Sequence, residues 1–371
     1  MTTVIFKKES NYDVSKLYDD FAKMLKIGNF YDRIEKGYKI LLKPNLLSAR
    51  TPDSAVTTNP AVIEAFARIL LELGATPIIA DSPGGAIRGT HRVLENTGML
   101  EIARKLGIKA VSLESYGATE KKLPDGENLH ISKIIDEVDG IINVAKLKTH
   151  SLVEMTLAVK NLYGLVPGFR KAEYHKIYPS PQRFAKLIVE LYSAIEHKLI
   201  FSIIDGIIGM DGNGPSSGRV RKFELLALSD NAPALDFEIE KMAPLKSHSP
   251  IVKELLKRDL VPQHDVKWLG EKIEHFENFK VPSNWYFYLA PAFLTKILGK
   301  LVRVAPDVED EKCIHCGDCM NSCPVGAISM EIGKTPPRFD YKKCIRCLCC
   351  HEICPTKAIV FKKSFLAKFI K

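Results

Sequence analysis

Eight cysteines near the end of the chain form two runs with the same spacing. Each run reads C-x2-C-x2-C-x3-C-P, and the second repeats the first 31 residues further along. The first run consists of Cys313, Cys316, Cys319 and Cys323, and the second of Cys344, Cys347, Cys350 and Cys354. The same offset relates Ala327-Ile328 to Ala358-Ile359, so the pattern is an internal duplication. This spacing is typical of a ferredoxin-type module with two 4Fe-4S clusters.

The spacing also predicts which thiolates share a cluster. A 4Fe-4S cluster needs four thiolate ligands, and a short loop with two-residue gaps supplies three of them. In modules of this type the fourth cysteine of each run ligates the other cluster. We therefore expect one cluster on Cys313, Cys316, Cys319 and Cys354, and the second on Cys344, Cys347, Cys350 and Cys323. Because the crossed ligation joins the two halves, we expect the module to need its metal to fold.

Zinc sites and disulfide bonds are the alternatives for these cysteines. Zinc knuckles use two cysteine pairs instead of runs of four closed by a proline. All nine cysteines lie within residues 313–354, which argues against the disulfide scaffold of a secreted protein. The ninth, Cys349, aligns with Asp318 in the repeat, so we interpret it as a packed thiol and not a cluster ligand.

The composition is that of a globular protein much larger than an iron-sulfur module. Of its 371 residues, 46% are hydrophobic and 26% are charged. Removing the module leaves about three hundred residues, enough for one large domain or two ordinary ones. The start, Met1 to Glu9, is a short strand-like run with no long apolar stretch behind it. We therefore expect no signal peptide and a cytoplasmic location.

The charge balance bears on the partners. The chain has 53 basic and 44 acidic residues, a formal net charge of +9. This surplus favours an anionic substrate or partner, although a solvated, lysine-rich surface would give the same count. No dense patch of basic and aromatic residues indicates nucleic-acid binding.

The residues before the cysteines alternate between strand and helix patterns. Strand patterns cover 4–7, 38–42, 75–80, 109–113, 140–145, 199–204 and 223–228. Helical patterns cover 14–27, 59–73, 90–106, 152–163, 182–196 and 233–242. Strands separated by helices predict an α/β domain with a doubly wound, mostly parallel sheet covered on both faces. The chain is thus divided into this domain (1–261), an aromatic-rich connecting segment (262–306), a small α+β iron-sulfur module (307–363) and an amphipathic tail (364–371).

Unusual residues follow the predicted strands. Ligands of open parallel sheets bind outside the carboxyl ends of the strands, and five loops are expected there: 43–45, 81–85, 146–150, 205–215 and 229–231. Each loop alone fits an ordinary turn, but together they predict a site. The predicted catalytic residues are Lys148, His150, Asp205 and Asp211, and the predicted substrate-binding residues are Lys43, Asn45, Asp81, Lys146, Lys160 and Asn213.

These residue types suggest defined roles at such a site. The lysines would bind an anion and stabilise developing negative charge, and the histidine and aspartates would supply protons or bind a metal. Thr156 and Lys160 are four residues apart in a predicted helix and would share a face. The chain has neither the glycine, lysine and serine order of a phosphate-binding loop nor a G-x-G-x-x-G motif after its first strand. A second cofactor or metal in the α/β domain is left open.

An ordered set of motifs resembles a known family, the domain-of-unknown-function family 362. The motifs are Lys43-Pro44-Asn45, Asp81-Ser82-Pro83-Gly84, Lys146 to His150, Lys160-Asn161, Asp211 to Pro215 and Asn231 to Asp236. Members of the family are often fused to a two-cluster ferredoxin, so the resemblance covers nearly the whole chain. It implies an iron-sulfur protein, but the family has no general activity to carry over. Asp211 stands where many relatives have glutamate, which keeps an acid there.

The connecting segment and the tail raise the question of membrane contact. The apolar run from Trp285 to Val304 is interrupted by Pro291, Lys296, Lys300 and Arg303, so it does not predict a transmembrane helix. We expect this segment to pack the iron-sulfur module onto the α/β domain. An interfacial membrane helix is the less favoured alternative, and the tail over 364–371 also fits it.

Two functions remain open from the sequence. In the first, an enzyme passes electrons from the clusters to an anionic small molecule or a second cofactor at the edge of the sheet. In the second, an accessory protein carries electrons to another redox protein or helps to assemble it, with the large domain as a docking surface. Either function requires a protein electron donor or acceptor. A buried pocket of lysine and aspartate side chains would favour the enzyme, and a flat basic face the accessory protein.

Overall fold

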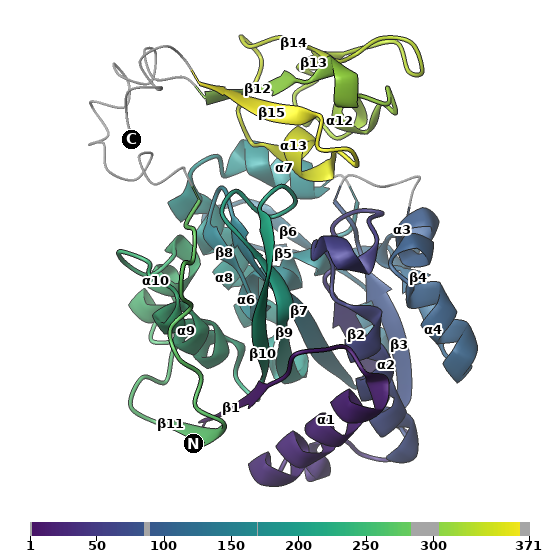
Figure 1. The fold of residues 1–371 in the computed structure, drawn as a ribbon, viewed down its shortest axis with the longest axis vertical. Coiled ribbons are helices and arrows are strands. Elements are labelled where there is room, and N and C mark those ends of the chain that lie inside the picture. The colour runs from purple at the N-terminus through teal and green to yellow at the C-terminus, as the bar shows by residue number, and fades with distance from the viewer. Residues whose placement is uncertain (1, 85–89, 169, 283–303, 364–371) are drawn as a thin grey trace.

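A computed structural model of the chain describes residues 2–84, 90–168, 170–282 and 304–363 (Figure 1). The larger part forms a sheet with helices on both faces, and the cysteine-rich module lies across one end of that sheet (Figure 1). The structure confirms the predicted α/β class and the small, separate module. Within the described residues, no helix is both long and apolar enough to cross a membrane.

The main sheet has nine strands among the described residues, in the order β11-β1-β10-β9-β7-β2-β3-β4, with β8 paired to β7. The strands are β1 (Thr2–Lys8), β2 (Lys39–Pro44), β3 (Thr76–Asp81), β4 (Lys109–Ser112), β7 (Gly140–His150), β8 (Glu154–Thr156), β9 (Leu199–Asp211), β10 (Arg219–Ser229) and β11 (Val266–Gly270). Strands β9, β7, β2, β3 and β4 run parallel, as do β1 and β11. A separate antiparallel hairpin consists of β5 (Ala118–Lys122) and β6 (Asn128–Ser132).

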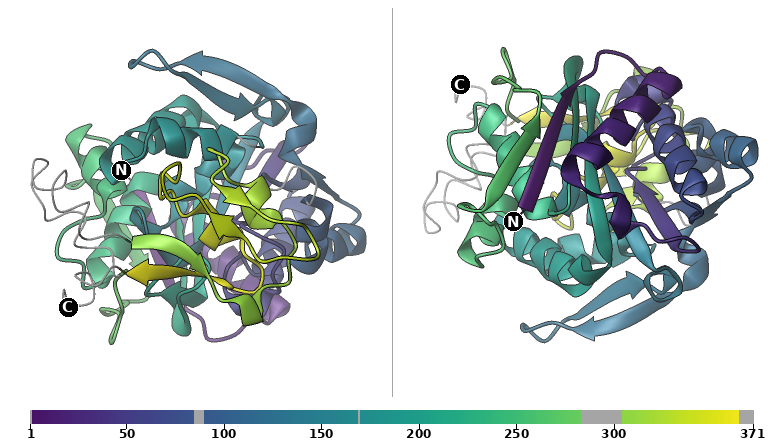
Figure 2. Two further views of the ribbon diagram at one scale, coloured as in Figure 1. Left: turned by 90° about the horizontal axis from the view of Figure 1, so that it is seen from above. Right: turned by 90° about the horizontal axis from the view of Figure 1, so that it is seen from below.

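Helices cover the sheet in two layers. One layer consists of α1 (Val14–Gly28), α2 (Pro60–Glu72), α3 (Thr90–Asn96) and α4 (Met99–Leu106). The other consists of α5 (Ile134–Glu137), α6 (Ala158–Asn161), α8 (Pro181–Ile195), α9 (Ala232–Met242) and α10 (Pro250–Lys257), with α7 (Arg170–Ile177) at its edge. Figure 2 shows the α1 layer from below. Short 3-10 helices span Tyr31–Arg33, Pro52–Ser54, Leu113–Tyr116, Leu162–Leu165, Glu196–Lys198 and Asp310–Lys312.

The strand side chains alternate between the two layers, as the period of a strand requires. On β7, Ile141 packs into the core under α8, whereas Ile142 packs into the core under α2. Helix starts follow the predicted signals. The Asn59 side chain accepts the N–H of Ala61, and Pro60 occupies the first turn of α2.

The carboxyl end of the parallel strands differs from the prediction at the last of the five loops, 229–231. Strand β10 runs antiparallel to β9, with Ser229 opposite Ser202 near the start of β9. The loop 229–231 therefore lies at the opposite end of the strands. The prediction that five loops meet at one end of the sheet is wrong for this loop. Strand β9 also continues through Asp205 to Asp211, so Asp205 is a strand residue and not a loop residue.

Two further segments differ from the sequence prediction. The predicted helix over 152–163 is strand β8, helix α6 and a 3-10 turn, so Thr156 and Lys160 do not share a helix. The predicted connecting segment contributes β11, which pairs with β1. The apolar run from Trp285 to Val304, except Val304 itself, and the tail over 364–371 lie outside the described residues.

The module shows the internal duplication in its backbone. Strands β12 (Val304–Val308) and β15 (Ile359–Lys363) pair antiparallel, as do β13 (Ile328–Ser329) and β14 (Arg338–Phe339). Helices α12 (Asp318–Asn321) and α13 (Cys349–Ile353) start 31 residues apart. Positive φ angles recur at the same offset in three pairs: His315 and Arg346, Gly317 and Leu348, and Gly326 and Lys357. The two halves therefore repeat one backbone path.

Candidate functional site

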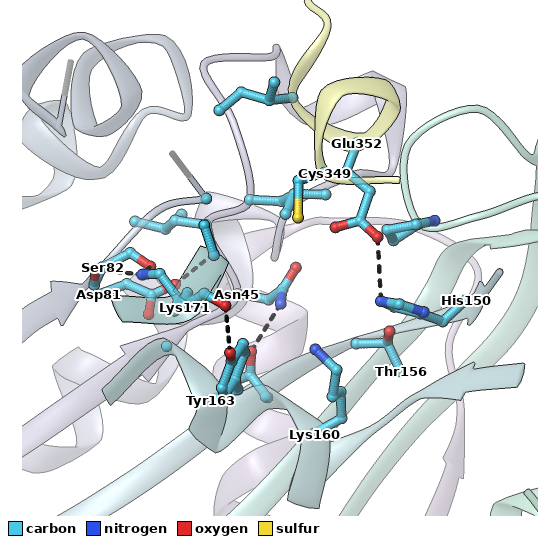
Figure 3. A pocket seen from close by; sticks show the side chains of 18 of the residues that line it. Asn45, Asp81, Ser82, His150, Thr156, Lys160, Tyr163, Lys171, Cys349 and Glu352 are labelled. Carbon is cyan, nitrogen blue, oxygen red and sulfur yellow. Dashed lines mark hydrogen bonds and ion pairs between the residues drawn. The ribbon is translucent and has the colours of Figure 1, made fainter. Parts of the chain in front are cut away.

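A cavity lies between the carboxyl ends of the sheet strands and the iron-sulfur module. Its volume is about 100 Å³. From the α/β domain it is lined by residues that include Asn45, Asp81, Ser82, Lys148, His150, Thr156, Lys160, Tyr163, Lys171 and His175, and from the module by Ser322, Cys349, Glu352 and Ile353 (Figure 3). The cavity thus joins residues of both parts of the chain.

A buried ion pair forms the floor of this site. The Nζ of Lys43 donates to Oδ1 of Asp81 at 2.8 Å, and both side chains are buried. The other Asp81 oxygen accepts the N–H of Leu46 at 2.7 Å. Gly164 covers the pair, and a Cβ there would collide with the Asp81 carboxylate. Because its charge is neutralised, Lys43 supports the site but has no free charge for a ligand.

Two other cavity lysines have neutral hydrogen-bond acceptors. Lys148 donates to Oδ1 of Asn45 at 2.7 Å and to the carbonyl of Val56 at 2.5 Å. Lys171 donates to the carbonyl and the hydroxyl of Ser82. Burial lowers the pKa of Lys148 to about 7 and that of Lys171 to about 8, because charge is unfavourable away from water.

The ammonium group of the third cavity lysine, Lys160, lies against two aromatic rings. Its Nζ lies 4.8 Å from the ring centre of Tyr163 and 5.4 Å from that of Phe184. Ring faces attract a cation, but burial lowers the pKa of Lys160 to about 8. Helix α6 holds Lys160 in place, because the carboxylate of Asp236 accepts the N–H groups of Ala158 and Val159 at 2.7 and 2.9 Å.

The two histidines of the cavity are neutral. Burial lowers the pKa of His175 to about 3 and that of His150 well below its usual range. Nδ1 of His150 accepts the N–H of Leu152 at 3.0 Å, which places the ring proton on Nε2. That Nε2 lies 3.5 Å from Oε1 of Glu352 (Figure 3). Burial raises the pKa of Glu352 to about 7.

Four of the ten residues predicted for catalysis or substrate binding neither line the cavity nor form its floor. Lys146 pairs with Asp205 at 2.8 Å, and both also contact the hydroxyl of Tyr12. Asp211 binds Arg219 through both carboxylate oxygens. Asn213, two residues beyond Asp211, does not line the cavity. The structure brings together the other six: Lys43, Asn45, Asp81, Lys148, His150 and Lys160.

The sequence analysis missed several cavity residues. Lys171 and His175 are one helical turn apart on α7, in a stretch without a strand or helix pattern of its own. Their i, i+4 spacing was the only local signal. Cys349 and Glu352 belong to the module and lie more than 180 residues from Lys160 in the chain. Such a contact has no signature in a single sequence.

The cysteines of the module fit the predicted clusters. A second cavity is lined by Cys313, Cys316, Cys319 and Cys354, which are the four predicted ligands of one cluster. Burial and the charges of Cys347, Cys319, Cys344 and Cys323 raise the pKa of Cys350, so the other predicted set also lies together, next to Cys319 of the first set. No three described His, Cys, Asp or Glu residues converge as the ligands of a single metal ion would. Cluster binding fits these thiols better, because they surround a space.

Backbone N–H groups point at one cysteine sulfur of each run. The N–H of Ala327 donates to Sγ of Cys323 at 3.2 Å, and the N–H of Ala358 donates to Sγ of Cys354 at 3.2 Å. Such hydrogen bonds favour a thiolate. They suit a cysteine that binds iron.

Polar contacts attach the module to the α/β domain. The guanidinium of Arg50 is buried and donates to the carbonyls of Ser216, at 3.0 Å, and of Cys354. Arg92 lies 3.5 Å from Asp318. These contacts lie near the predicted first cluster, whereas Cys349, on the cavity, lies between two ligands of the second.

Comparisons with known proteins match two parts of the chain. Residues 305–355 match the 4Fe-4S dicluster domain, so the module is an iron-sulfur domain. The thylakoid-associated protein sll1697 of Synechocystis sp. (strain ATCC 27184 / PCC 6803 / Kazusa) is 36% identical over 246 residues, which are 66% of this chain and 75% of that protein.

A solved structure, the lactate racemase apoprotein from Thermoanaerobacterium thermosaccharolyticum, aligns with a TM-score of 0.39 and 16% identity. The alignment covers 61% of this chain and 53% of that one, so the chain spans about half the length of that protein. Residues 40–239, which hold every residue of the cavity from the α/β domain, match the domain of unknown function DUF362. The chain belongs to the DUF362 family.

Proposed function

We propose that this protein passes low-potential electrons from two 4Fe-4S clusters, ligated in the crossed pattern, to a small anionic molecule in the cavity between its two parts. One observation carries the proposal: lysines of the α/β domain and residues next to the cluster cysteines line the same cavity. Cys349 lies between Cys347 and Cys350, and Ser322 precedes Cys323. An electron leaving the second cluster therefore has a short path to a molecule bound there.

The side chains of the cavity have distinct tasks in this proposal. Lys148, Lys160 and Lys171 bind the anion and stabilise the negative charge that grows as it is reduced. Glu352, whose pKa is raised to about 7 by burial, can deliver a proton to the reduced product, and the Nε2–H of His150 next to it orients its carboxyl group. Asp205 and Asp211, which form ion pairs elsewhere, have no role in it. The clusters, when bound, supply the electrons one at a time.

The test starts from anaerobically prepared protein. About eight irons per chain are expected for two 4Fe-4S clusters. The clusters are reduced and followed by EPR while candidate anionic metabolites are added singly. A substrate reoxidises the clusters, and Lys148→Met slows this step by on the order of 100-fold without changing the iron content. Lys176→Met, at an exposed position of α7, is the matched control. If about four irons are found, or if Lys148→Met reoxidises as fast as the wild type, the proposal is wrong.

A second function, accessory electron transfer to another protein, is favoured by a different observation. Three large apolar side chains of the module are exposed: Ile314 (61%), Ile332 (56%) and Tyr341 (47%). Exposed apolar groups next to a cluster would suit a redox partner protein. If no small anion reoxidises the clusters and a purified ferredoxin does so at a rate that Ile314→Lys lowers, this second function replaces the first.

A further inference from the structure

Buried lysines outside the cavity each have an aspartate partner. Lys43 pairs with Asp81 and Lys146 with Asp205, both at 2.8 Å. This is the usual rule, since a buried charge without a partner is costly. Lys148 (1% exposed) and Lys171 (8% exposed) are buried as well. Lys148 and Lys171, which line the cavity, do not follow this pattern of lysine–aspartate pairs.

The cavity has a surplus of positive charge. Within the described residues, Lys148, Lys160 and Lys171 have no carboxylate within ion-pair distance. Two carboxylates face the cavity. Asp81 is neutralised by Lys43, and Glu352 lies against His150. Three lysines against one remaining carboxylate leave a surplus of two positive charges when all are ionised.

Two polar atoms in the cavity wall also lack partners. Oγ1 of Thr156 and Nδ1 of His175 are buried and make no hydrogen bond in the described part of the chain. Thr156 is 4% exposed and His175 6% exposed. Buried polar atoms nearly always have a hydrogen-bond partner. Thr156 lies close to Lys160 in the wall (Figure 3), so one bound group could contact both.

The size of the cavity limits the ligand. A volume of about 100 Å³ is on the order of a few water molecules, which suits a compact ion and excludes a nucleotide. We infer that the cavity binds a small dianion, such as inorganic phosphate or a short dicarboxylate, between Lys148, Lys160 and Lys171, with Thr156 and His175 as neutral hydrogen-bond partners. The inference deepens the proposed function, because it names the class of the molecule in the same cavity.

The charges that line the cavity favour a ligand with two negative charges. Burial lowers the pKa of the three lysines, so an anion bound between them stabilises their ammonium forms. A dianion supplies two negative charges that the side chains lining the cavity do not provide. A monoanion leaves one positive charge buried and unpaired, which lowers its affinity.

The test measures binding to the full, cluster-loaded chain by anaerobic isothermal titration calorimetry. The probes are inorganic phosphate, malonate, acetate and the neutral malonamide. We expect phosphate, malonate or both to bind about tenfold or more tightly than acetate, and malonamide not to bind. Binding of phosphate alone identifies a tetrahedral oxyanion site, and binding of malonate alone a dicarboxylate site. Acetate binding as tightly as both dianions, or no dianion binding, overturns the inference.

Variants locate the binding. Lys160→Met should weaken dianion binding by about tenfold or more, and it breaks no hydrogen bond in the described structure. Thr156→Val removes one neutral partner and should weaken binding less. Lys176→Met, on the exposed side of α7, should bind as the wild type does. Iron content and far-UV circular dichroism show that each variant is folded. Unchanged affinity in folded Lys160→Met places the binding elsewhere and overturns the inference.

The same data separate this inference from the proposed function. Phosphate does not accept electrons from iron-sulfur clusters, so its binding is measured without any turnover. If dianions bind but no anion ever reoxidises the clusters, the inference stands and the proposed function fails. If a monoanion reoxidises the clusters and no dianion binds, the proposed function stands and the inference fails.

Discussion

A buried arginine lies next to one predicted cluster ligand. Arg50 is 7% exposed and donates to the backbone carbonyl of Cys354. A positive charge near a cluster favours its reduced, more negative state, because charge and hydrogen bonding around the sulfurs help to set the potential. Among the predicted cluster ligands in the described structure, Arg50 donates a hydrogen bond to Cys354 of the first cluster and to no ligand of the second, so the two clusters should respond differently to its loss.

We therefore predict that Arg50→Gln lowers the midpoint potential of the first cluster and leaves the second nearly unchanged. EPR-monitored redox titration of the holoprotein measures both potentials in one sample, so the second cluster is an internal control. Arg92→Gln is the matched variant, because its pair with Asp318 is exposed and screened by water. Equal shifts of both clusters would mean that Arg50 acts on the docking of the whole module.

At the scale of elements, the short helix α6 positions Lys160. A helix of four residues has little stability of its own, and its first N–H groups are bound by the carboxylate of Asp236 on α9. Asp236→Ala should lower the free energy of unfolding by about 2 kcal/mol and weaken dianion binding. Urea unfolding and calorimetry measure the two effects. Asp236→Asn keeps one acceptor and should lose less of both, and equal losses in the two variants would contradict this account.

The positions of the strands and helices were largely predictable from the sequence, whereas the direction of β10 in the sheet was not. Most predicted strands and helices begin close to the observed ones, because apolar periodicity and caps such as Asn59 act locally, but β7 and β9 run on to His150 and Asp211. The antiparallel direction of β10 was missed because β9 runs past Asp205 to Asp211 before the chain turns back. Sequence periodicity carries no sign of strand direction.

At the scale of the molecule, the cavity requires both parts of the chain. The module has its own small hydrophobic core around Ile328 and Ile359, separate from the two cores of the α/β domain. Removing iron with a chelator should therefore unfold the module and keep most of the α/β circular dichroism signal. The apoprotein should then bind malonate or phosphate about tenfold or more weakly than the holoprotein. Equal affinity in calorimetry would show that the module wall is not needed.

The candidate site was predictable in part for the same reason. Lys43, Asn45, Asp81, Lys148 and His150 lie at or just beyond the carboxyl ends of strands, and the topology of a parallel sheet brings such ends together. Lys146 was predicted on the same grounds, but its side chain pairs with Asp205 instead of lining the cavity. The module side of the cavity depends on how two separately folded parts dock. No local pattern encodes that contact.

The duplicated backbone of the module has a further consequence. Two nearly equivalent halves could in principle face the α/β domain in either of two orientations. The side chains at matching positions differ, however: Asp318 meets Arg92 and its counterpart Cys349 faces the cavity, while Glu352 meets His150 and its counterpart is Asn321. A half-turn would give up both the Arg92–Asp318 ion pair and the contact between His150 and Glu352. Divergence between the copies thus leaves a single orientation of the module in which both contacts can form.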